Sequence, residues 1–182
     1  MSQIFHLEKC FSTNDEILSL LNEDESTAVF TFNQTKGRGQ YGNIWKVIPN
    51  QNLAYSIAIK TSNIRISDTF LNYYTAIIVR DFLANLTNAS CKIKWPNDII
   101  LNGKKGCGIL IEKKKFENVE YYIIGIGINV LQTDFSNLPK AGSVLTATDL
   151  SFDLKEFTNQ FHQYLISRIQ DINPEEEILN IY

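Results

Sequence analysis

The spacing of hydrophobic and polar residues predicts a mixed order of strands and helices. Residues 53 to 60 alternate large apolar side chains with Ala, Ser, Ala and Lys, a period of two that is typical of a strand. Residues 69 to 86 carry apolar positions at helical spacing after a capping Ser67 or Asp68, and they predict a helix long enough to pack across a sheet. The same spacing predicts another long helix from Leu154 to Ile169.

The N-terminal part is predicted to alternate in a similar way. A short strand near Ile4 to Leu7 precedes a helix from about Asn14 to Leu21, and a strand follows at 27 to 33. The segment Thr13-Asn14-Asp15-Glu16 has the form of a capping box, in which the first and last side chains bond each other's backbone N–H groups. This segment is therefore expected to open the helix.

Short strands are predicted in close succession later in the chain, at 91 to 95, 99 to 101, 108 to 112 and 121 to 130. Asn102-Gly103 is a strong hairpin signal, and Lys113-Lys114-Lys115 is predicted to be a solvated turn. Strands this close together favour antiparallel pairing, because parallel neighbours need a crossover segment. The pattern therefore predicts one α+β domain over residues 1 to 182, with a mixed, mostly antiparallel sheet flanked by helices.

Composition narrows the class of protein. The chain has 182 residues, 44% hydrophobic residues and a formal net charge of −3, which describes a globular domain able to bury a core. No apolar run approaches the roughly 20 residues that span a bilayer, so no membrane partner and a cytoplasmic location are expected. The acidic balance disfavours nucleic-acid binding, which calls for a basic stripe.

The cysteines and histidines do not form a metal-binding pattern. Cys10, Cys91 and Cys107 are odd in number and widely spread, and His6 and His162 have no neighbouring ligands. Reduced thiols and no structural metal are therefore expected. Cys107 is interpreted as a small core residue rather than a nucleophile.

Residues 34 to 45 form a glycine-rich loop that carries two cations, Lys36 and Arg38. Glycines let backbone N–H groups approach a ligand closely. Arginine can bind an oxyanion in a two-pronged way, whereas lysine acts as a point charge. Together with Lys94 farther along the chain, the loop is predicted to bind carboxylate or phosphate oxygens.

Two common phosphate motifs match these glycines only in part. The nucleoside-triphosphate loop requires Lys and Ser or Thr where Asn43 and Ile44 stand. The dinucleotide fingerprint requires a helix after the glycines, but residues 43 to 49 are rich in β-branched side chains and close with a proline. It also requires an acid about 20 residues farther on, whereas the first acid after Gly42 is Asp68. Neither motif is predicted to operate here.

Five segments of the chain resemble the catalytic domain of the biotin–protein ligase family and occur in that family's order. They are Ser12-Thr13-Asn14, Gln34 with the loop from Gly37 to Trp45, Lys94 to Asp98, Lys105 to Leu110, and Gly125 to Asn129. The family's fold resembles that of class II aminoacyl-tRNA synthetases and lipoate ligases. This resemblance implies the same mixed, mostly antiparallel sheet that the periodicity predicts.

The resemblance implies that biotin is activated by ATP as biotinyl-5'-AMP and transferred to a lysine of a biotin carboxyl carrier protein, usually that of acetyl-CoA carboxylase. ATP is expected as its Mg²⁺ complex. Lys94 and Arg38 are the implied catalytic cations, Lys94 between the biotin carboxylate and the α-phosphate, and Arg38 on a loop that closes over the intermediate. For Asn129 a buried hydrogen bond, and for Lys105 a turn position, are the alternative roles. The implied ATP-binding residues are Arg38, Trp45, Lys94, Asn97, Lys105 and Asn129.

The same resemblance implies a biotin-binding set. Its residues are Ser12, Thr13, Asn14, Gln34, Gly37, Arg38, Gly39, Gln40, Lys94, Gly125 and Gly127. Helix capping is the alternative role of Ser12 and Thr13. Gly125 and Gly127 are expected to let a ligand pass over a strand, with a β-bulge as the alternative. The chain departs from the family at Gln40, where many members carry a second arginine.

Other functions and boundaries stay open at this point. A lipoate or octanoate ligase or transferase has the same fold, and a biotin-binding module without turnover would keep the same pocket. The N-terminal DNA-binding module and the C-terminal β-barrel domain of some relatives are expected to be absent. Asn173-Pro174-Glu175 has the features of a helix start, so either a longer parent protein or a short docked helix is expected there. The sequence does not decide the carrier protein or whether the chain forms a homodimer.

Overall fold

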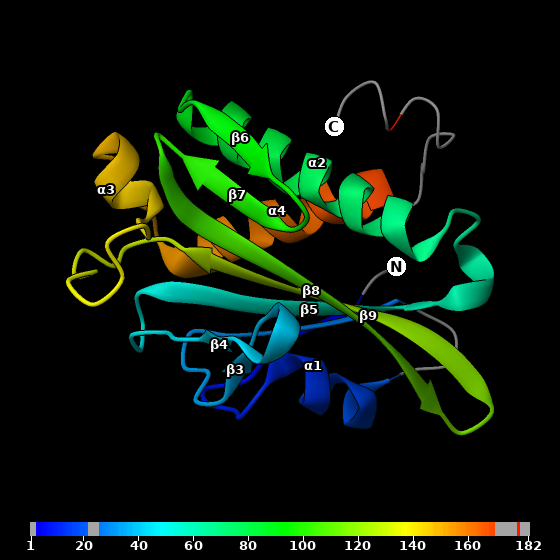
Figure 1. The fold of residues 1–182 in the computed structure, drawn as a ribbon. Helices are drawn as coiled ribbons and strands as arrows, with labels where there is room; N and C mark the ends of the chain where they lie inside the picture. The colour runs from blue at the N-terminus through cyan, green and yellow to red at the C-terminus, as the bar shows by residue number, and fades with distance from the viewer. Residues whose placement is uncertain (1–2, 22–25, 170–177, 179–182) are drawn as a thin grey trace. The chain divides into compact units, whose positions relative to one another are not determined.

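The chain folds into two compact units that each combine segments distant in sequence (Figure 1). A computed structural model describes residues 3–21, 26–169 and 178. Unit 1 comprises Met1–Ile64 and Ile109–Gly127, and unit 2 comprises Arg65–Gly108 and Ile128–Tyr182.

Unit 1 is built on a sheet whose hydrogen-bonded order is β1-β2-β5-β9-β8. Its elements are β1 (Gln3–His6), α1 (Thr13–Glu16), η1 (Ile17–Leu20), β2 (Thr27–Thr31), β3 (Gly37–Arg38), η2 (Gln40–Gly42), β4 (Ile44–Trp45), β5 (Asn52–Lys60), η3 (Thr61–Asn63) and most of β8 (Lys104–Phe116) and β9 (Val119–Asn129). β1 pairs in parallel with β2, and β2 pairs antiparallel with β5. This register sets Val29 opposite Ser56.

One face of the unit 1 sheet carries small side chains where α1 and η1 pack. Successive side chains of a strand point to opposite faces, so Ala54, Ser56 and Ala58 of β5 lie together on that face. Both α1 and η1 contact β2 and β5 there. The buried core on this side consists of Ile17, Val29, Ala58, Tyr121 and Ile123. The sequence therefore leaves room beneath α1 for a polar side chain, and Ser56 occupies it.

Unit 2 combines a short antiparallel ladder with the long helices. Its elements are α2 (Asp68–Thr87), β6 (Cys91–Lys94), β7 (Asp98–Leu101), the start of β8, α3 (Val144–Thr148), α4 (Leu154–Ile169) and the last two residues of β9. β7 is hydrogen-bonded to both β6 and β8. Helix α2 packs against β6, β7 and α4 (Figure 1). Phe82 of α2 contacts Phe157 and Phe161 of α4 at ring-centroid distances of 5.5 and 5.2 Å.

The structure confirms several predicted elements. Helix α2 follows an N-cap at Ser67, and α4 has the predicted bounds. The hairpin between β7 and β8 turns at Asn102 and Gly103, whose φ angles of 45° and 84° require residues that tolerate the left-handed region. The close succession of strands from β6 to β9 is also confirmed.

The predicted helix from 14 to 21 is wrong in extent. Helix α1 ends at Glu16 and continues as the 3₁₀ turn η1. The predicted capping box is also wrong, because Ser12 is the N-cap and its side chain makes no capping hydrogen bond. The backbone N–H groups of Asp15 and Glu16 instead donate to the Ser12 carbonyl. The Thr13 hydroxyl contacts Ser56 and Gln34 and does not cap the helix.

The predicted turn at Lys113-Lys114-Lys115 is wrong as well. These lysines lie inside β8, which is longer than the predicted strand, and the turn comes at Glu117 with φ of 52°. The segment stays extended because the Lys113 ammonium lies over the Tyr122 ring at 5.0 Å and Lys114 pairs with Asp15. Helix α3 and the β3–β4 pair were not predicted.

The predicted helix start at Asn173 lies outside the described residues. Within the described ranges, none of the helices has the length and apolar character needed to cross a membrane.

Candidate active site

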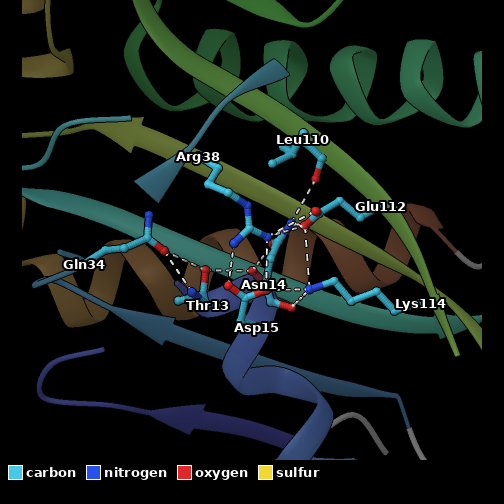
Figure 2. A network of polar contacts seen from close by, with 9 residues as sticks. Thr13, Asn14, Asp15, Gln34, Arg38, Leu110, Glu112 and Lys114 are labelled. Carbon is cyan, nitrogen blue, oxygen red and sulfur yellow. Dashed lines mark hydrogen bonds and ion pairs between the residues drawn. The ribbon is translucent and has the colours of Figure 1, made fainter. Parts of the chain in front are cut away.

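A network of charged side chains lies on the α1 face of the unit 1 sheet (Figure 2). The Arg38 guanidinium binds Asp15 with both terminal nitrogens, at 2.5 and 3.0 Å. Its Nη2 also donates to both carboxylate oxygens of Glu112, at 3.1 and 3.0 Å. Such bidentate pairing fixes the plane of the guanidinium. The charge of Arg38 is therefore matched by two carboxylates in this structure.

Lys114 closes the network from β8. Its ammonium lies 2.6 Å from Asp15 Oδ1 and 3.9 Å from Glu112 Oε2. The ammonium also donates to the backbone carbonyl of Asn14 at 3.0 Å. The two cations and two carboxylates have a net charge of zero. Hydrogen bonding from Arg38, followed by contributions from Lys114, lowers the pKa of Asp15 from 3.8 to about 2. The same pairing raises the pKa of Arg38. The network therefore links α1, β3 and β8 through ion pairs whose charges balance.

The Asp15 carboxyl is expected to titrate far below its ordinary value. Because folding lowers its pKa, the Asp15 carboxylate stabilises the fold above pH 3.8, and this contribution is lost as the pH falls through about 2. Carboxyl-detected NMR titration measures this directly. Arg38→Gln should raise the Asp15 pKa more than Lys114→Gln, because the Arg38 hydrogen bond is the larger cause. Equal shifts in the two variants would contradict this ranking.

Asn14 lies beneath this network with its amide held at both ends. Nδ2 donates to Glu112 Oε2 at 2.7 Å and lies 3.4 Å from the Leu110 carbonyl (Figure 2). Oδ1 lies 2.6 Å from the Ser56 hydroxyl. Asn14 also fits against Gly125 so closely that a Cβ on Gly125 would lie 2.3 Å from Oδ1. Gly125 thus makes room for the Asn14 side chain, and its predicted contact with biotin stays a prediction.

Thr13 and Gln34 lie beside Asn14. The Thr13 backbone N–H donates to Gln34 Oε1 at 2.9 Å. The Thr13 hydroxyl lies 2.7 Å from the Ser56 hydroxyl and 3.3 Å from Gln34 Oε1. The Ser12 hydroxyl has no hydrogen-bond partner among the described residues, so the capping alternative does not apply to it. Four of the predicted biotin-binding residues, Ser12 to Asn14 and Gln34, are therefore brought together in unit 1.

The glycine-rich loop forms a small hairpin. β3 and β4 pair antiparallel, with Gly37 opposite Trp45 and Arg38 opposite Ile44. A Cβ on Gly37 would lie 2.4 Å from the Trp45 carbonyl oxygen and 2.6 Å from Gln34 Nε2, so this position requires glycine. A Cβ on Gly127 would lie 2.4 Å from the Trp45 ring. As at Gly125, a protein side chain lies close to Gly127, and the predicted contact of Gly127 with biotin stays a prediction.

The tip of this hairpin has fewer constraints. A Cβ on Gly39 would meet nothing closer than 3.4 Å, and the Gln40 carbonyl accepts a hydrogen bond from the Asn43 side chain at 2.9 Å. Tyr41 is 90% exposed. Lys36 does not join the charged network described above, and its ammonium lies over the Phe11 ring at 4.2 Å. The predicted roles of Gly39 and Gln40 stay predictions.

The other predicted site residues belong to unit 2. Lys94 is the exposed last residue of β6, opposite Asp98 of β7, and its ammonium makes no hydrogen bond or ion pair within the described part of the chain. Lys105 forms an ion pair with Asp98 at 2.6 Å. Asn129 is buried and donates from Nδ2 to the Gly142 carbonyl at 2.9 Å, which fits its alternative structural role. Asn97 is half-buried, next to Asp98.

The cysteines do not resemble nucleophiles. Burial raises the pKa of Cys10 and of Cys91 to about 11. Cys107 is fully buried, which confirms it as a core residue, and burial raises its pKa as well. No group of three or more His, Cys, Asp or Glu side chains within the described ranges is arranged to hold a metal ion.

Several residues of this site have little or no signal in the sequence. Ser56 carried a weak signal, as a polar residue between two alanines on the buried face of a strand. The sequence pattern predicts Asp15 only as part of a helix cap and Lys114 only as part of a turn. Glu112 has no recognisable signal, because its hydrogen-bond partners Asn14 and Arg38 come from segments far away in the sequence. Asp98 lies within a recognisable motif, but the motif does not predict its ion pair with Lys105.

The arrangement can be compared with known proteins. A family model described as the biotin/lipoate A/B protein ligase family matches residues 8–129. The chain belongs to this family. The matched range includes the charged network, the glycine-rich hairpin and Lys94.

Individual relatives of the ligase family agree with this assignment. The chain is 36% identical over 112 residues to the bifunctional ligase/repressor BirA of Bacillus subtilis, covering 61% of this chain and 34% of the relative. It is 32% identical over 142 residues to the biotin–[acetyl-CoA-carboxylase] ligase of Paracoccus denitrificans, covering 76% and 57%. The chain thus spans about a third of the first relative and somewhat more than half of the second.

A solved structure confirms the predicted fold class. The fold matches the biotin protein ligase from Aquifex aeolicus, solved in complex with biotin and ATP, with a TM-score of 0.81 and 26% identity. The match covers 92% of this chain and 70% of that one. The mixed, mostly antiparallel sheet with flanking helices is therefore the biotin protein ligase fold.

Proposed function

We propose that this chain activates biotin with ATP to form biotinyl-5'-AMP and transfers the biotinyl group to a lysine of a carrier protein. The observation that carries the proposal is the polar face formed by Ser12, Thr13, Asn14 and Gln34. These side chains come from two separate segments, yet they meet on one face of unit 1. The names of the relatives support biotin as the substrate that this face binds.

The first step requires two negatively charged reactants to meet. A biotin carboxylate oxygen attacks the α-phosphorus of the Mg²⁺ complex of ATP, an O–P bond forms, and the bond to the departing pyrophosphate breaks. Cations placed at the reacting oxygens supply the main catalytic effect in such a transfer. Lys94 is suited to this role because its ammonium is exposed and makes no ion pair within the described part of the chain.

Arg38, the second predicted catalytic cation, differs from Lys94 in its ion pairs. Arg38 is already paired with Asp15 and Glu112, so its charge is balanced before any ligand arrives. We infer that Arg38 first serves to hold the glycine-rich hairpin on the biotin-binding face. Its direct contact with the intermediate would require exchange of a carboxylate for the ligand's phosphate.

The second step releases AMP. The lysine amine of the carrier attacks the acyl carbon of biotinyl-5'-AMP, an amide bond forms, the bond to the AMP oxygen breaks, and the amine loses a proton. A hairpin that covers the anhydride would protect it from water until the carrier arrives. The carrier is proposed to be the biotin carboxyl carrier protein of acetyl-CoA carboxylase or of a related carboxylase. The reaction is proposed to occur in the cytoplasm, where free thiols such as Cys10, Cys91 and Cys107 stay reduced.

Pyrophosphate exchange tests the first step. The purified chain, incubated with biotin, MgATP and labelled pyrophosphate, is expected to incorporate label into ATP only when biotin is present. Exchange with lipoate or octanoate in place of biotin would reassign the substrate. Biotin binding by calorimetry without any exchange would indicate a binding module. Mass spectrometry of a carrier domain after incubation tests the transfer step separately.

A further inference from the structure

We propose that Glu112 and Ser56 are specificity-determining positioning residues, which fix the direction of a hydrogen-bond chain that ends at Thr13. This inference rests on the proposed function, because it describes how the biotin-binding face of unit 1 selects its ligand. Glu112 and Ser56 both contact Asn14, and Ser56 also contacts Thr13. The chain therefore runs from Glu112 through Asn14 and Ser56 to Thr13.

The direction is set first at Glu112. A carboxylate can only accept hydrogen bonds, and an amide has one end that donates and one that accepts. The Asn14 atom that lies 2.7 Å from Glu112 Oε2 must therefore be the amide nitrogen. Because the amide nitrogen faces Glu112, the side-chain oxygen Oδ1 of Asn14 faces Ser56.

The direction then passes through Ser56. The Asn14 oxygen can only accept, so the single hydroxyl proton of Ser56 must lie on the 2.6 Å contact to it. The contact of 2.7 Å between Ser56 Oγ and Thr13 Oγ1 still needs a proton, and only Thr13 can supply it. The contact from Thr13 Oγ1 to Gln34 Oε1 is longer, at 3.3 Å, than the contact to Ser56. The Thr13 proton is therefore directed at Ser56 and not at Gln34.

The result is a defined pattern of groups beside the ligand. With its proton directed at Ser56, the Thr13 oxygen offers a lone pair, and so it accepts. Gln34 Oε1 is occupied by the Thr13 backbone N–H at 2.9 Å, so the nitrogen of the same amide is left to donate. Gln34 Nε2 has no hydrogen-bond partner within the described ranges. An acceptor beside a donor complements a ring N–H beside a carbonyl, the chemistry of a cyclic urea.

The three inner members of this hydrogen-bond chain are buried. Ser56 is completely buried, and Thr13 and Asn14 are 3% and 4% exposed. The Asn14 side chain packs directly on the backbone of Gly125, since a Cβ there would lie 2.3 Å from the amide oxygen. In such a buried chain, reversal of one bond requires reversal of its neighbours. A site built to accept from an N–H rejects an analogue without it, because the buried acceptor then faces another acceptor.

The test compares two isosteric ligands. Each is a biotin analogue with one ureido N–H replaced by a ring oxygen, and the two regioisomers differ only in which N–H is lost. One regioisomer is expected to bind wild-type protein about 10- to 100-fold more weakly than biotin, because its ring oxygen faces the Thr13 lone pair. The other serves as the matched ligand control.

Two small changes of side chain then alter the direction of the hydrogen-bond chain. In Ser56→Ala the Thr13 hydroxyl loses its acceptor and can turn to donate to the ring oxygen. In Glu112→Gln the Asn14 amide can flip and reverse every bond up to Thr13. Both variants are expected to reduce the discrimination against the affected regioisomer about tenfold. Ser56→Thr keeps a hydroxyl and is expected to restore discrimination.

Asp15→Asn is the matched control for Glu112→Gln. Each neutralises one carboxylate bound to Arg38, but Asp15 is not part of the chain through Asn14. Discrimination is expected to stay at the wild-type ratio in Asp15→Asn. An equal loss of discrimination in Asp15→Asn and Glu112→Gln would overturn the assignment, since the effect would then come from Arg38. Unchanged discrimination in both Ser56→Ala and Glu112→Gln would also overturn it.

A measurement without ligand separates this inference from the proposed function. Neutron diffraction of the deuterated protein is expected to place the Ser56 deuteron toward Asn14 and the Thr13 deuteron toward Ser56. A Ser56 deuteron directed at Thr13 would refute the inference even if biotin binds. If wild-type protein binds no biotin while the deuterons lie as expected, the proposed function fails and the hydrogen-bond direction stands.

Discussion

Lys94→Ala is expected to slow formation of biotinyl-5'-AMP by about 100- to 1,000-fold, the loss typical of removing one preorganised donor at a developing charge. Lys94 is the predicted catalytic residue whose ammonium has no ion pair or hydrogen bond within the described part of the chain. Its full charge is therefore available to an incoming oxyanion. The change should reduce biotin affinity much less than it reduces the rate, because the stabilised charge develops mainly in the transition state.

Lys92→Ala provides a matched control for this effect. Lys92 lies two positions earlier on β6, is also exposed, and points to the same face of the strand as Lys94. It carries the same charge, so a general loss of positive potential would affect both variants alike. Single-turnover measurement of adenylate formation, with biotin affinity from calorimetry, separates rate from binding. Equal losses of rate and affinity in Lys94→Ala would contradict the catalytic role, and a similar rate loss in Lys92→Ala would assign the effect to charge in general.

The contrast between Lys94 and Arg38 shows what sequence reasoning could and could not provide. Both residues were identified from short motifs, because motif identity depends only on neighbouring residues. Their electrostatic states depend on distant residues: Arg38 binds Glu112, which lies far away along the chain, whereas Lys94 has no such partner within the described ranges. The sequence predicted two catalytic cations. Among the described residues, Lys94 has no ion pair, whereas the charge of Arg38 is balanced by carboxylates.

Those parts of the fold that depend on neighbouring residues were predictable from the sequence as well. The helices α2 and α4 and the hairpin at Asn102-Gly103 depend on local periodicity and turn chemistry, and they were predicted correctly. The short helix α1 was predicted too long, because its end is set by packing of η1 on β2 and β5 rather than by local signals. Lys114 illustrates the same limit, since its place inside a strand depends on contacts with the distant residues Asn14 and Asp15.

Gly125→Ala is expected to lower the free energy of unfolding by about 1–3 kcal/mol, the cost typical of overpacking a well-filled core. The added Cβ would lie 2.3 Å from Asn14 Oδ1 and 2.9 Å from its Cγ and Nδ2. Asn14 cannot swing aside cheaply, because Glu112 and Ser56 hold the two ends of its amide. The same displacement should disturb the biotin-binding face, so biotin affinity is expected to fall at least about tenfold, the equivalent of 1.4 kcal/mol.

A double-mutant cycle identifies Asn14 as the cause. In an Asn14→Ala background the clash is removed, and Gly125→Ala should then cost nothing or even stabilise the strand by up to about 0.5–1 kcal/mol, because alanine restricts the unfolded chain more than glycine does. Gly39→Ala serves as the stability control, since its Cβ would meet no atom closer than 3.4 Å and urea unfolding should change by less than about 0.5 kcal/mol. If Gly125→Ala costs the same in both backgrounds, the steric account of Gly125 is wrong. The strand would then require glycine for its own backbone, and the position of Asn14 would need another explanation.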